Sequence, residues 1–135
     1  MPRNTVLIVD DDPDQHTVCG TYLEHAGYAV MHAFDGQEGV EMARLHQPRV
    51  VLMDIRMPRM DGVSARRALA ADAVTAGIPV VALSADVLTW LEPRVMAEGF
   101  AAYLPKPCNL TRIMGLVASL ALPEPGLLAG PALAV

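Results

Sequence analysis

The sequence contains few cysteines and no long hydrophobic run. Its 135 residues include two cysteines, Cys19 and Cys108, which are too few for a disulfide framework, so we treat both as small, reduced hydrophobic residues. No apolar stretch reaches the roughly 20 residues that a membrane helix needs. The apolar run near the start is too short, and is ended too soon by acids, for a signal peptide. These absences predict a cytoplasmic protein.

Basic charge is also scarce. The formal net charge is -5, and the chain has one lysine, Lys106. A nucleic-acid surface needs a basic stripe, and an anionic membrane also attracts basic residues, so neither is an expected partner. A protein, a cation or a small molecule is favoured instead. The composition, 53% hydrophobic and 19% charged, is typical of one compact domain with a real core.

Short valine-rich runs alternate with longer amphipathic stretches along the chain. The runs are "TVLIV", "YAVMHA", "VVLM", "PVVAL" and "AAYL", each flanked by Gly, Pro or Asp. Five such strand and helix units in about 120 residues predict an α/β fold, an open, parallel, doubly wound sheet with five helices. The chain is too short for a closed eightfold barrel.

Capping residues mark the predicted helices. Asp12 is a plausible N-cap before Pro13, Gly27 is the expected stop, and Val18, Tyr22 and Leu23 are expected on one apolar face. The next helices follow the cap Asp35 and run from about Gly62 to Asp72. A fourth ends at Gly99, with Pro93 as its expected start. The fifth follows Asn109 and turns Leu110, Ile113, Met114 and Val117 inward.

Reactive side chains follow the strands. The ligand site of an open parallel sheet lies beyond the carboxyl ends of its strands, where this chain has Asp10, Asp11, Asp12, Asp54, Ser84, Pro105, Lys106 and Pro107. Asp10, Asp11 and Asp54 would repel one another by about 4 kcal/mol per pair at 4 Å and an effective dielectric near 20. Such a cluster needs a cation, and oxygen ligands favour Mg²⁺ over zinc.

Lys106 adds a positive charge at the same edge of the predicted sheet. A compact ammonium and a metal facing a carboxylate are typical of phosphoryl transfer, and the Ser84 hydroxyl could hydrogen-bond a phosphoryl oxygen. Asp54 is then the predicted nucleophile, which would form an acyl phosphate.

Four segments, "VLIVDDDPD", "VVLMDIRMPRMDG", "VVALSAD" and "AAYLPKP", resemble in order and spacing the receiver domain of two-component response regulators. The resemblance covers residues 5 to about 121. It implies a flavodoxin-like sheet of order 2-1-3-4-5. It also implies that Asp54 is phosphorylated by a phosphohistidine on a histidine kinase or a histidine phosphotransfer protein.

The resemblance also implies the roles of the neighbouring residues. Asp11 and the backbone carbonyl of Arg56 would bind Mg²⁺ together with Asp54, and Asp10 would bind it through water. Ser84, the Ala85 backbone and Lys106 would hold the phosphoryl group, and Tyr103 would turn inward when Ser84 moves. The Lys106–Pro107 peptide bond is expected to be cis.

Some positions depart from the usual pattern of the family. Ser84 stands where threonine is usual, which suggests looser coupling to Tyr103. Arg56 places a cation two residues after the phosphorylation site. The apolar run Val87, Leu88, Trp90 and Leu91 is a candidate partner surface.

Other interpretations of these residues compete with the receiver hypothesis. Asp12 is interpreted as a helix cap only. His16 and Cys19 lie one helical turn apart, but two ligands without a third do not make a metal site. A haloacid-dehalogenase-type phosphatase would need a second acid after its nucleophile, and a flavin binder would need a phosphate loop where this chain has three acids. A phosphorylation-independent interaction module is the more serious alternative.

The expected domain covers residues 1–122, followed by a Pro-, Gly- and Ala-rich tail or linker at 123–135. We identify no DNA-binding element, so a downstream protein partner is expected. The sequence does not decide between a free-standing regulator and a receiver fragment of a hybrid histidine kinase.

Overall fold

A computed structural model describes residues 4–57, 60–85, 97–107 and 109–120. Their elements follow one another as β1 (Thr5–Val9), α1 (Pro13–His25), β2 (Ala29–Ala33), α2 (Gly36–His46), β3 (Val50–Asp54), α3 (Gly62–Ala71), β4 (Val80–Ser84), β5 (Ala102–Pro105) and α5 (Leu110–Leu120). The expected start of the fourth helix at Pro93 and the candidate partner surface fall in residues 86–96, outside the described residues, whereas residues 97–99, its expected end, are described and are not helical. The predicted domain boundary at 122 also lies outside them.

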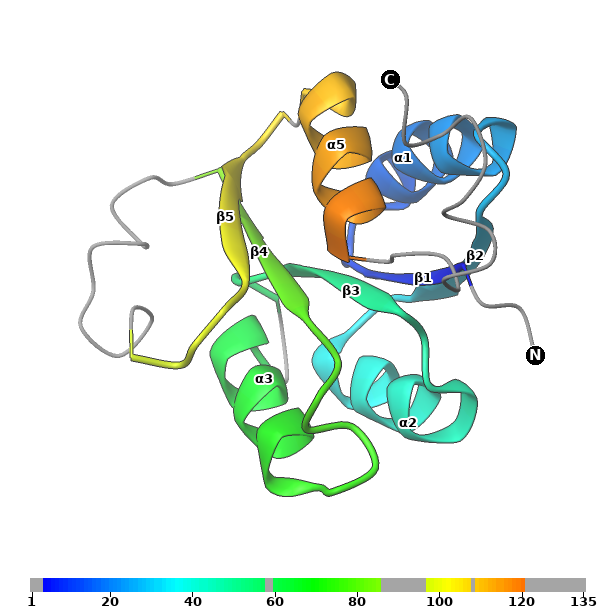
Figure 1. Ribbon diagram of the computed structural model, residues 1–135. Coiled ribbons are helices and arrows are strands. Elements are labelled where there is room, and N and C mark those ends of the chain that lie inside the picture. The colour runs from blue at the N-terminus through cyan, green and yellow to red at the C-terminus, as the bar shows by residue number, and fades with distance from the viewer. Residues whose placement is uncertain (1–3, 58–59, 86–96, 108, 121–135) are drawn as a thin grey trace.

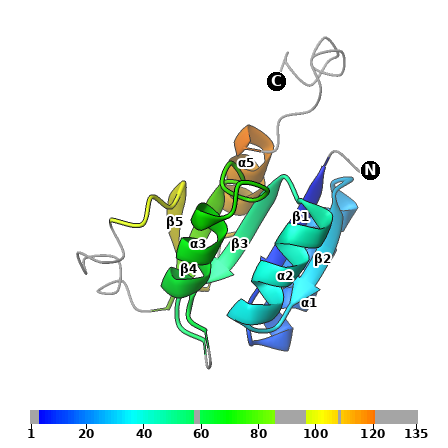
Figure 2. The ribbon, with the colours of Figure 1, turned by 90° about the horizontal axis from the view of Figure 1, so that it is seen from below.

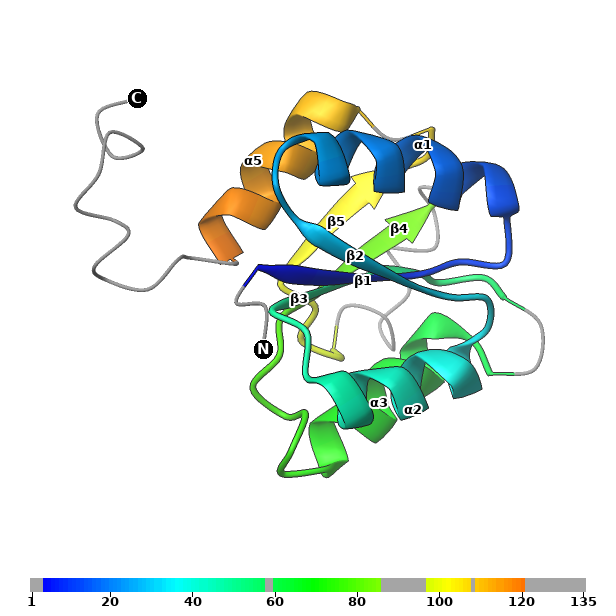
Figure 3. The ribbon, with the colours of Figure 1, turned by 90° about the vertical axis from the view of Figure 1, so that its right-hand side faces the viewer.

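The five strands form one parallel sheet in the order β2-β1-β3-β4-β5, as predicted. Helices α1 and α5 cover one face and α2 and α3 the other (Figures 1 and 3). Seen from below, α2 and α3 lie side by side in front of the strands (Figure 2). The carboxyl ends of β1, β3, β4 and β5 therefore meet at one edge of the sheet.

Alternating side chains divide the core into two layers. In β1, Val6 and Ile8 face α1 and α5, whereas Leu7 and Val9 face α2 and α3, and all four are fully buried. Strands covered on both faces have to be apolar throughout, which explains the continuous valine-rich runs.

Aspartates begin three of the helices. The side chains of Asp12, Asp35 and Asp61 accept hydrogen bonds from the backbone N–H groups of Asp14, Glu38 and Ser64, at 2.9, 2.8 and 2.8 Å. Each bond satisfies a donor that the first helical turn leaves unpaired. The predicted caps Asp12 and Asp35 are confirmed.

Glycines end α1 and begin α3. Gly27 has a φ of +100°, which only glycine adopts readily, and follows the last turn of α1 as predicted. Gly62 lies against the end of β3, where an added Cβ would be 2.5 Å from the Asp54 carbonyl oxygen. The Asp61–Gly62 pair thus begins a helix while keeping the chain close to Asp54.

The predicted apolar face of α1 is confirmed for Leu23, which is fully buried, but is wrong for Val18 and Tyr22. Val18 and Tyr22 are 53% and 38% exposed, while the buried residues of the helix are His16, Cys19, Gly20 and Leu23. The buried face includes a histidine and a glycine, so the apolar residues alone indicate the wrong side of the helix. In α5, by contrast, the predicted inward residues do contribute to the core.

Candidate functional site

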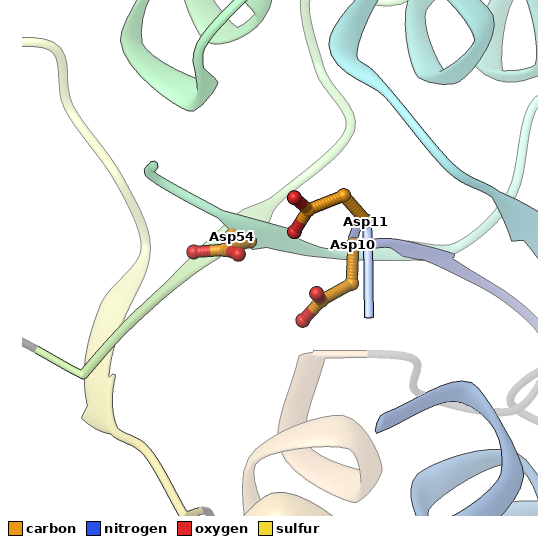
Figure 4. Close-up of side chains that lie close together, drawn as sticks. All are labelled: Asp10, Asp11 and Asp54. Carbon is orange, nitrogen blue, oxygen red and sulfur yellow. The ribbon is translucent and has the colours of Figure 1, made fainter. Parts of the chain in front are cut away.

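Three carboxylates converge at the carboxyl edge of the sheet. Asp10 and Asp11 directly follow β1, Asp54 is the last residue of β3, and one carboxylate oxygen of each lies within 4.8 Å of the others (Figure 4). Adjacent parallel strands bring these residues together although 43 positions separate Asp11 from Asp54 in the sequence. The predicted acidic cluster is therefore present.

The three acids differ in burial. Asp10 is fully buried and Asp54 is 6% exposed, whereas Asp11 is exposed to solvent. Asp10 Oδ1 accepts a hydrogen bond from the backbone N–H of Asp12 at 2.9 Å. Asp54 Oδ1 accepts one from the backbone N–H of Arg56 at 3.2 Å. In each of these two buried acids, Oδ1 accepts a backbone hydrogen bond, and Oδ2 is the oxygen that faces the cluster.

Lys106 provides the positive charge that faces these oxygens. It follows β5, and its Nζ lies 2.9 Å from Asp10 Oδ2 and 3.3 Å from Asp54 Oδ2. Its backbone N–H donates to the Ser84 carbonyl at 2.9 Å, which ties the loop after β5 to the end of β4. The peptide bond to Pro107 is cis, as predicted.

The surroundings shift the pKa values of both partners. Burial, with the charge of Asp10, raises the pKa of Asp54 to about 6, against the opposing effects of Lys106 and the Arg56 N–H. Burial would lower the pKa of Lys106, but its contacts with Asp10 and Asp54 outweigh burial and raise it. Lys106 therefore stays charged at neutral pH, while the charge on Asp54 is costly.

The donor set fits Mg²⁺. The Lys106 ammonium pairs with two of the three clustered carboxylates, those of Asp10 and Asp54, so negative charge remains in the cluster. Among the described residues, the buried Asp10 Oδ2 has no well-aligned hydrogen bond, and its ion pair with Lys106 is its polar contact. An oxygen-only cluster with one exposed member suits a hard cation that keeps part of its water shell.

The remaining predicted site residues lie near this cluster. Ser84 is buried at the end of β4, next to β3, and the exposed Ala85 follows it. Tyr103 in β5 is half-buried and contacts Phe100 edge-on, with ring centroids 5.9 Å apart. The roles predicted for Ser84, Ala85, Tyr103 and the Arg56 carbonyl stay predictions.

Sequence reasoning missed one residue that touches the cluster. His16 Nε2 lies 2.8 Å from the Asp10 carbonyl oxygen, and His16 Nδ1 lies 2.7 Å from Nδ1 of His32. The contact with His32 depends on how α1 lies over β2, which the spacing in the sequence does not show.

The fold and the acidic edge define a class of signalling domain, and comparison with known proteins identifies it. The response regulator receiver domain family matches residues 6–118, so the chain belongs to this family. The polar-differentiation response regulator DivK of Brucella anthropi is 31% identical over 119 residues, which cover 88% of this chain and 96% of DivK. The protein is thus similar to response regulators of two-component signalling.

Two further comparisons show the range of the family. The transcriptional regulatory protein PdtaR of Mycobacterium tuberculosis is 36% identical over 115 residues, and the match covers 84% of this chain and 54% of PdtaR. This chain thus spans about half the length of PdtaR. The receiver domain of the sensor histidine kinase PA1611 from Pseudomonas aeruginosa PAO1 has a TM-score of 0.80 and 30% identity, covering 87% of this chain and 96% of that domain. That crystal structure has a magnesium ion coordinated in its active-site cleft.

Over the part of the chain that the structure describes, no helix is long and apolar enough to cross a membrane.

Proposed function

We propose that Asp54 accepts a phosphoryl group from a phosphohistidine on a histidine kinase or a histidine phosphotransfer protein. The observation that carries the proposal is the convergence of Asp10, Asp11 and Asp54 beside Lys106. An Asp54 oxygen forms the new bond to phosphorus while the P–N bond of the donor breaks, and the imidazole keeps the electron pair and takes up a proton. The product is an acyl phosphate.

The residues around Asp54 would divide the work of holding the reacting groups. Bound Mg²⁺ would offset the negative charge of the acids and the phosphoryl oxygens, held by Asp54, Asp11, the Arg56 carbonyl and, through water, Asp10. Lys106 lies close enough to Asp54 to contact a phosphoryl oxygen there. The Ser84 hydroxyl and the Ala85 N–H follow the neighbouring strand and would hold the other oxygens.

The chain would catalyse only its own phosphorylation and dephosphorylation, and its output would pass to a protein partner. When Ser84 is drawn toward a phosphorylated Asp54, the segment after β4 would move with it, and Tyr103 would turn inward into the space that this segment leaves. Its residues Val87, Leu88, Trp90 and Leu91, which lie outside the described residues, are the proposed partner surface. A small difference in contact energy is enough to shift this segment between its two arrangements, because about 1.4 kcal/mol changes the ratio of two states tenfold.

The test is the intact mass after incubation with acetyl phosphate and Mg²⁺. We expect one added phosphoryl group on the wild type, none without Mg²⁺, and none on Asp54→Asn, whose amide is not a competent nucleophile. Asp12→Asn is the matched control. Asp12 caps α1, so this substitution should leave phosphorylation intact. An unmodified wild type would favour the phosphorylation-independent interaction module instead.

A further inference from the structure

His16 is buried beside the acidic cluster but outside it. It lies in the first turns of α1 and is 5% exposed, and its ring packs against the Phe34 ring, with centroids 4.2 Å apart and planes tilted by 31°. Its Nε2 lies 2.8 Å from the Asp10 carbonyl oxygen. A carbonyl oxygen only accepts hydrogen bonds, so Nε2 of His16 must carry the hydrogen.

The Asp10 carbonyl places the hydrogen on Nε2 of His16, and His32 lies against the other ring nitrogen. In a neutral imidazole protonated at Nε2, Nδ1 is an acceptor, and His16 Nδ1 lies 2.7 Å from His32 Nδ1. With a neutral His16 of this tautomer, His32 is the donor, from its own Nδ1. Gly20 leaves room for this ring, since an added Cβ would lie 3.1 Å from His32 Cε1. The hydrogen bonds run in one direction, from His32 to His16 to the Asp10 carbonyl.

This chain of bonds ends on the peptide group that joins the two metal-site acids. The Asp10 N–H donates to the Ala33 carbonyl at 3.1 Å, so β2 holds one side of Asp10. His16 holds the other side, the carbonyl of the peptide between Asp10 and Asp11. The orientation of that peptide sets the direction in which Asp11 leaves β1. Oriented ligands bind metals more tightly than ligands that must be ordered on binding.

We propose that His16 is a positioning residue for Asp10 and Asp11, and that His32 keeps it in the Nε2–H tautomer; this inference rests on the proposed function. His16 does not bind the metal itself, because both of its ring nitrogens are engaged elsewhere. It acts through the backbone, as the outer hydrogen-bond partners of metal ligands do.

Mg²⁺ affinity, measured by calorimetry at constant pH, tests this positioning role. We expect His16→Phe, which keeps a flat ring but no donor, to weaken Mg²⁺ binding by about tenfold. His16→Gln, whose amide N–H can stand near the position of Nε2, should stay within about threefold of the wild type. If His16→Phe does not fold, His32→Phe serves in its place, since it removes the donor that fixes the His16 tautomer.

Two control variants separate positioning from packing. Cys19→Ala removes a buried side chain one helical turn along α1 and should lower stability without changing Mg²⁺ affinity. His25→Gln changes an exposed histidine in the last turn and should change neither. An affinity loss in Cys19→Ala as large as that in His16→Phe would reduce the role of His16 to packing and overturn the proposal.

The tautomers have a spectroscopic signature of their own. Long-range ¹H–¹⁵N NMR spectra should show His16 protonated at Nε2 and His32 at Nδ1 in the wild type. A His16 protonated only at Nδ1, or unchanged Mg²⁺ affinity in His16→Phe, would overturn this inference while leaving the proposed function intact. A wild type that binds no Mg²⁺ would overturn both.

Discussion

The aspartates at the strand ends and those at the helix starts are the same residue in opposite surroundings. Asp12 is exposed and Asp35 and Asp61 are half-buried, and each accepts a hydrogen bond from a helix N–H. Asp10 and Asp54 are buried and face each other across one ammonium. The helix caps stabilise the start of each helix. The strand-end acids instead bring together more negative charge than the Lys106 ammonium offsets. Only the second arrangement is suited to binding a cation and a phosphoryl group.

The largest expected effect is a difference in Mg²⁺ affinity between variants of two neighbouring aspartates, Asp11 and Asp12. Asp11→Asn removes a charged ligand from the cluster and should weaken Mg²⁺ binding by about 100-fold. Asp12→Asn keeps a side-chain oxygen that can cap α1 and should change the affinity by less than about twofold. Calorimetric titration of both variants with MgCl₂ measures the contrast, and equal losses would place the metal site one residue away from our assignment.

The next largest expected effect concerns Lys106, the cation that pairs with the buried acids Asp10 and Asp54. Lys106→Met leaves Asp10 and Asp54 without their cation and should lower the free energy of unfolding by about 2 kcal/mol at pH 7.5. The loss should shrink near pH 5, where Asp54 is protonated, and in saturating Mg²⁺. Urea unfolding measures it.

Lys106→Arg is the matched variant, because it keeps the charge but presents a planar fork. It should bind Mg²⁺ yet respond poorly to phosphorylation. A Lys106→Met protein as stable as the wild type at pH 7.5 would show that the two buried acids do not depend on this ammonium.

A smaller effect concerns the charge on Asp54 itself. Its pKa of about 6 in the folded protein lies above the ordinary value of 3.8, so folding favours the protonated form and ionisation lowers stability as pH rises between these values. Asp54→Asn should therefore be more stable than the wild type by about 1–2 kcal/mol at pH 7.5.

The gain from Asp54→Asn should vanish toward pH 4, where the wild-type carboxyl is protonated. Thermal unfolding at several pH values without Mg²⁺ tests the trend, with Asp12→Asn as a control that should show no such dependence. If the stability gained by Asp54→Asn were the same at every pH, the gain would not arise from ionisation of Asp54, and this explanation would be contradicted.

Much of the strand-end region follows from sequence, because its signals are local or are set by sheet topology. Valine-rich runs ending in acids predicted the sheet and the meeting of Asp10, Asp11, Asp54 and Lys106. On α1 the burial of Leu23 was predicted correctly and that of Val18 and Tyr22 wrongly, because the buried side of the helix includes the polar His16 and the glycine Gly20. The contact between His16 and His32 depends on the packing of a helix on a strand, which no spacing rule contains.

The acyl phosphate itself offers the most direct test of the central claim. After phosphorylation with acetyl phosphate and Mg²⁺, borohydride reduction converts an aspartyl phosphate into homoserine, and peptide mass spectrometry locates the converted residue. We expect conversion at Asp54 alone, dependent on Mg²⁺, with Asp10, Asp11 and Asp12 unchanged. Conversion at another residue, or no conversion in a protein that binds Mg²⁺, would contradict the assignment of Asp54 as the phosphoryl acceptor.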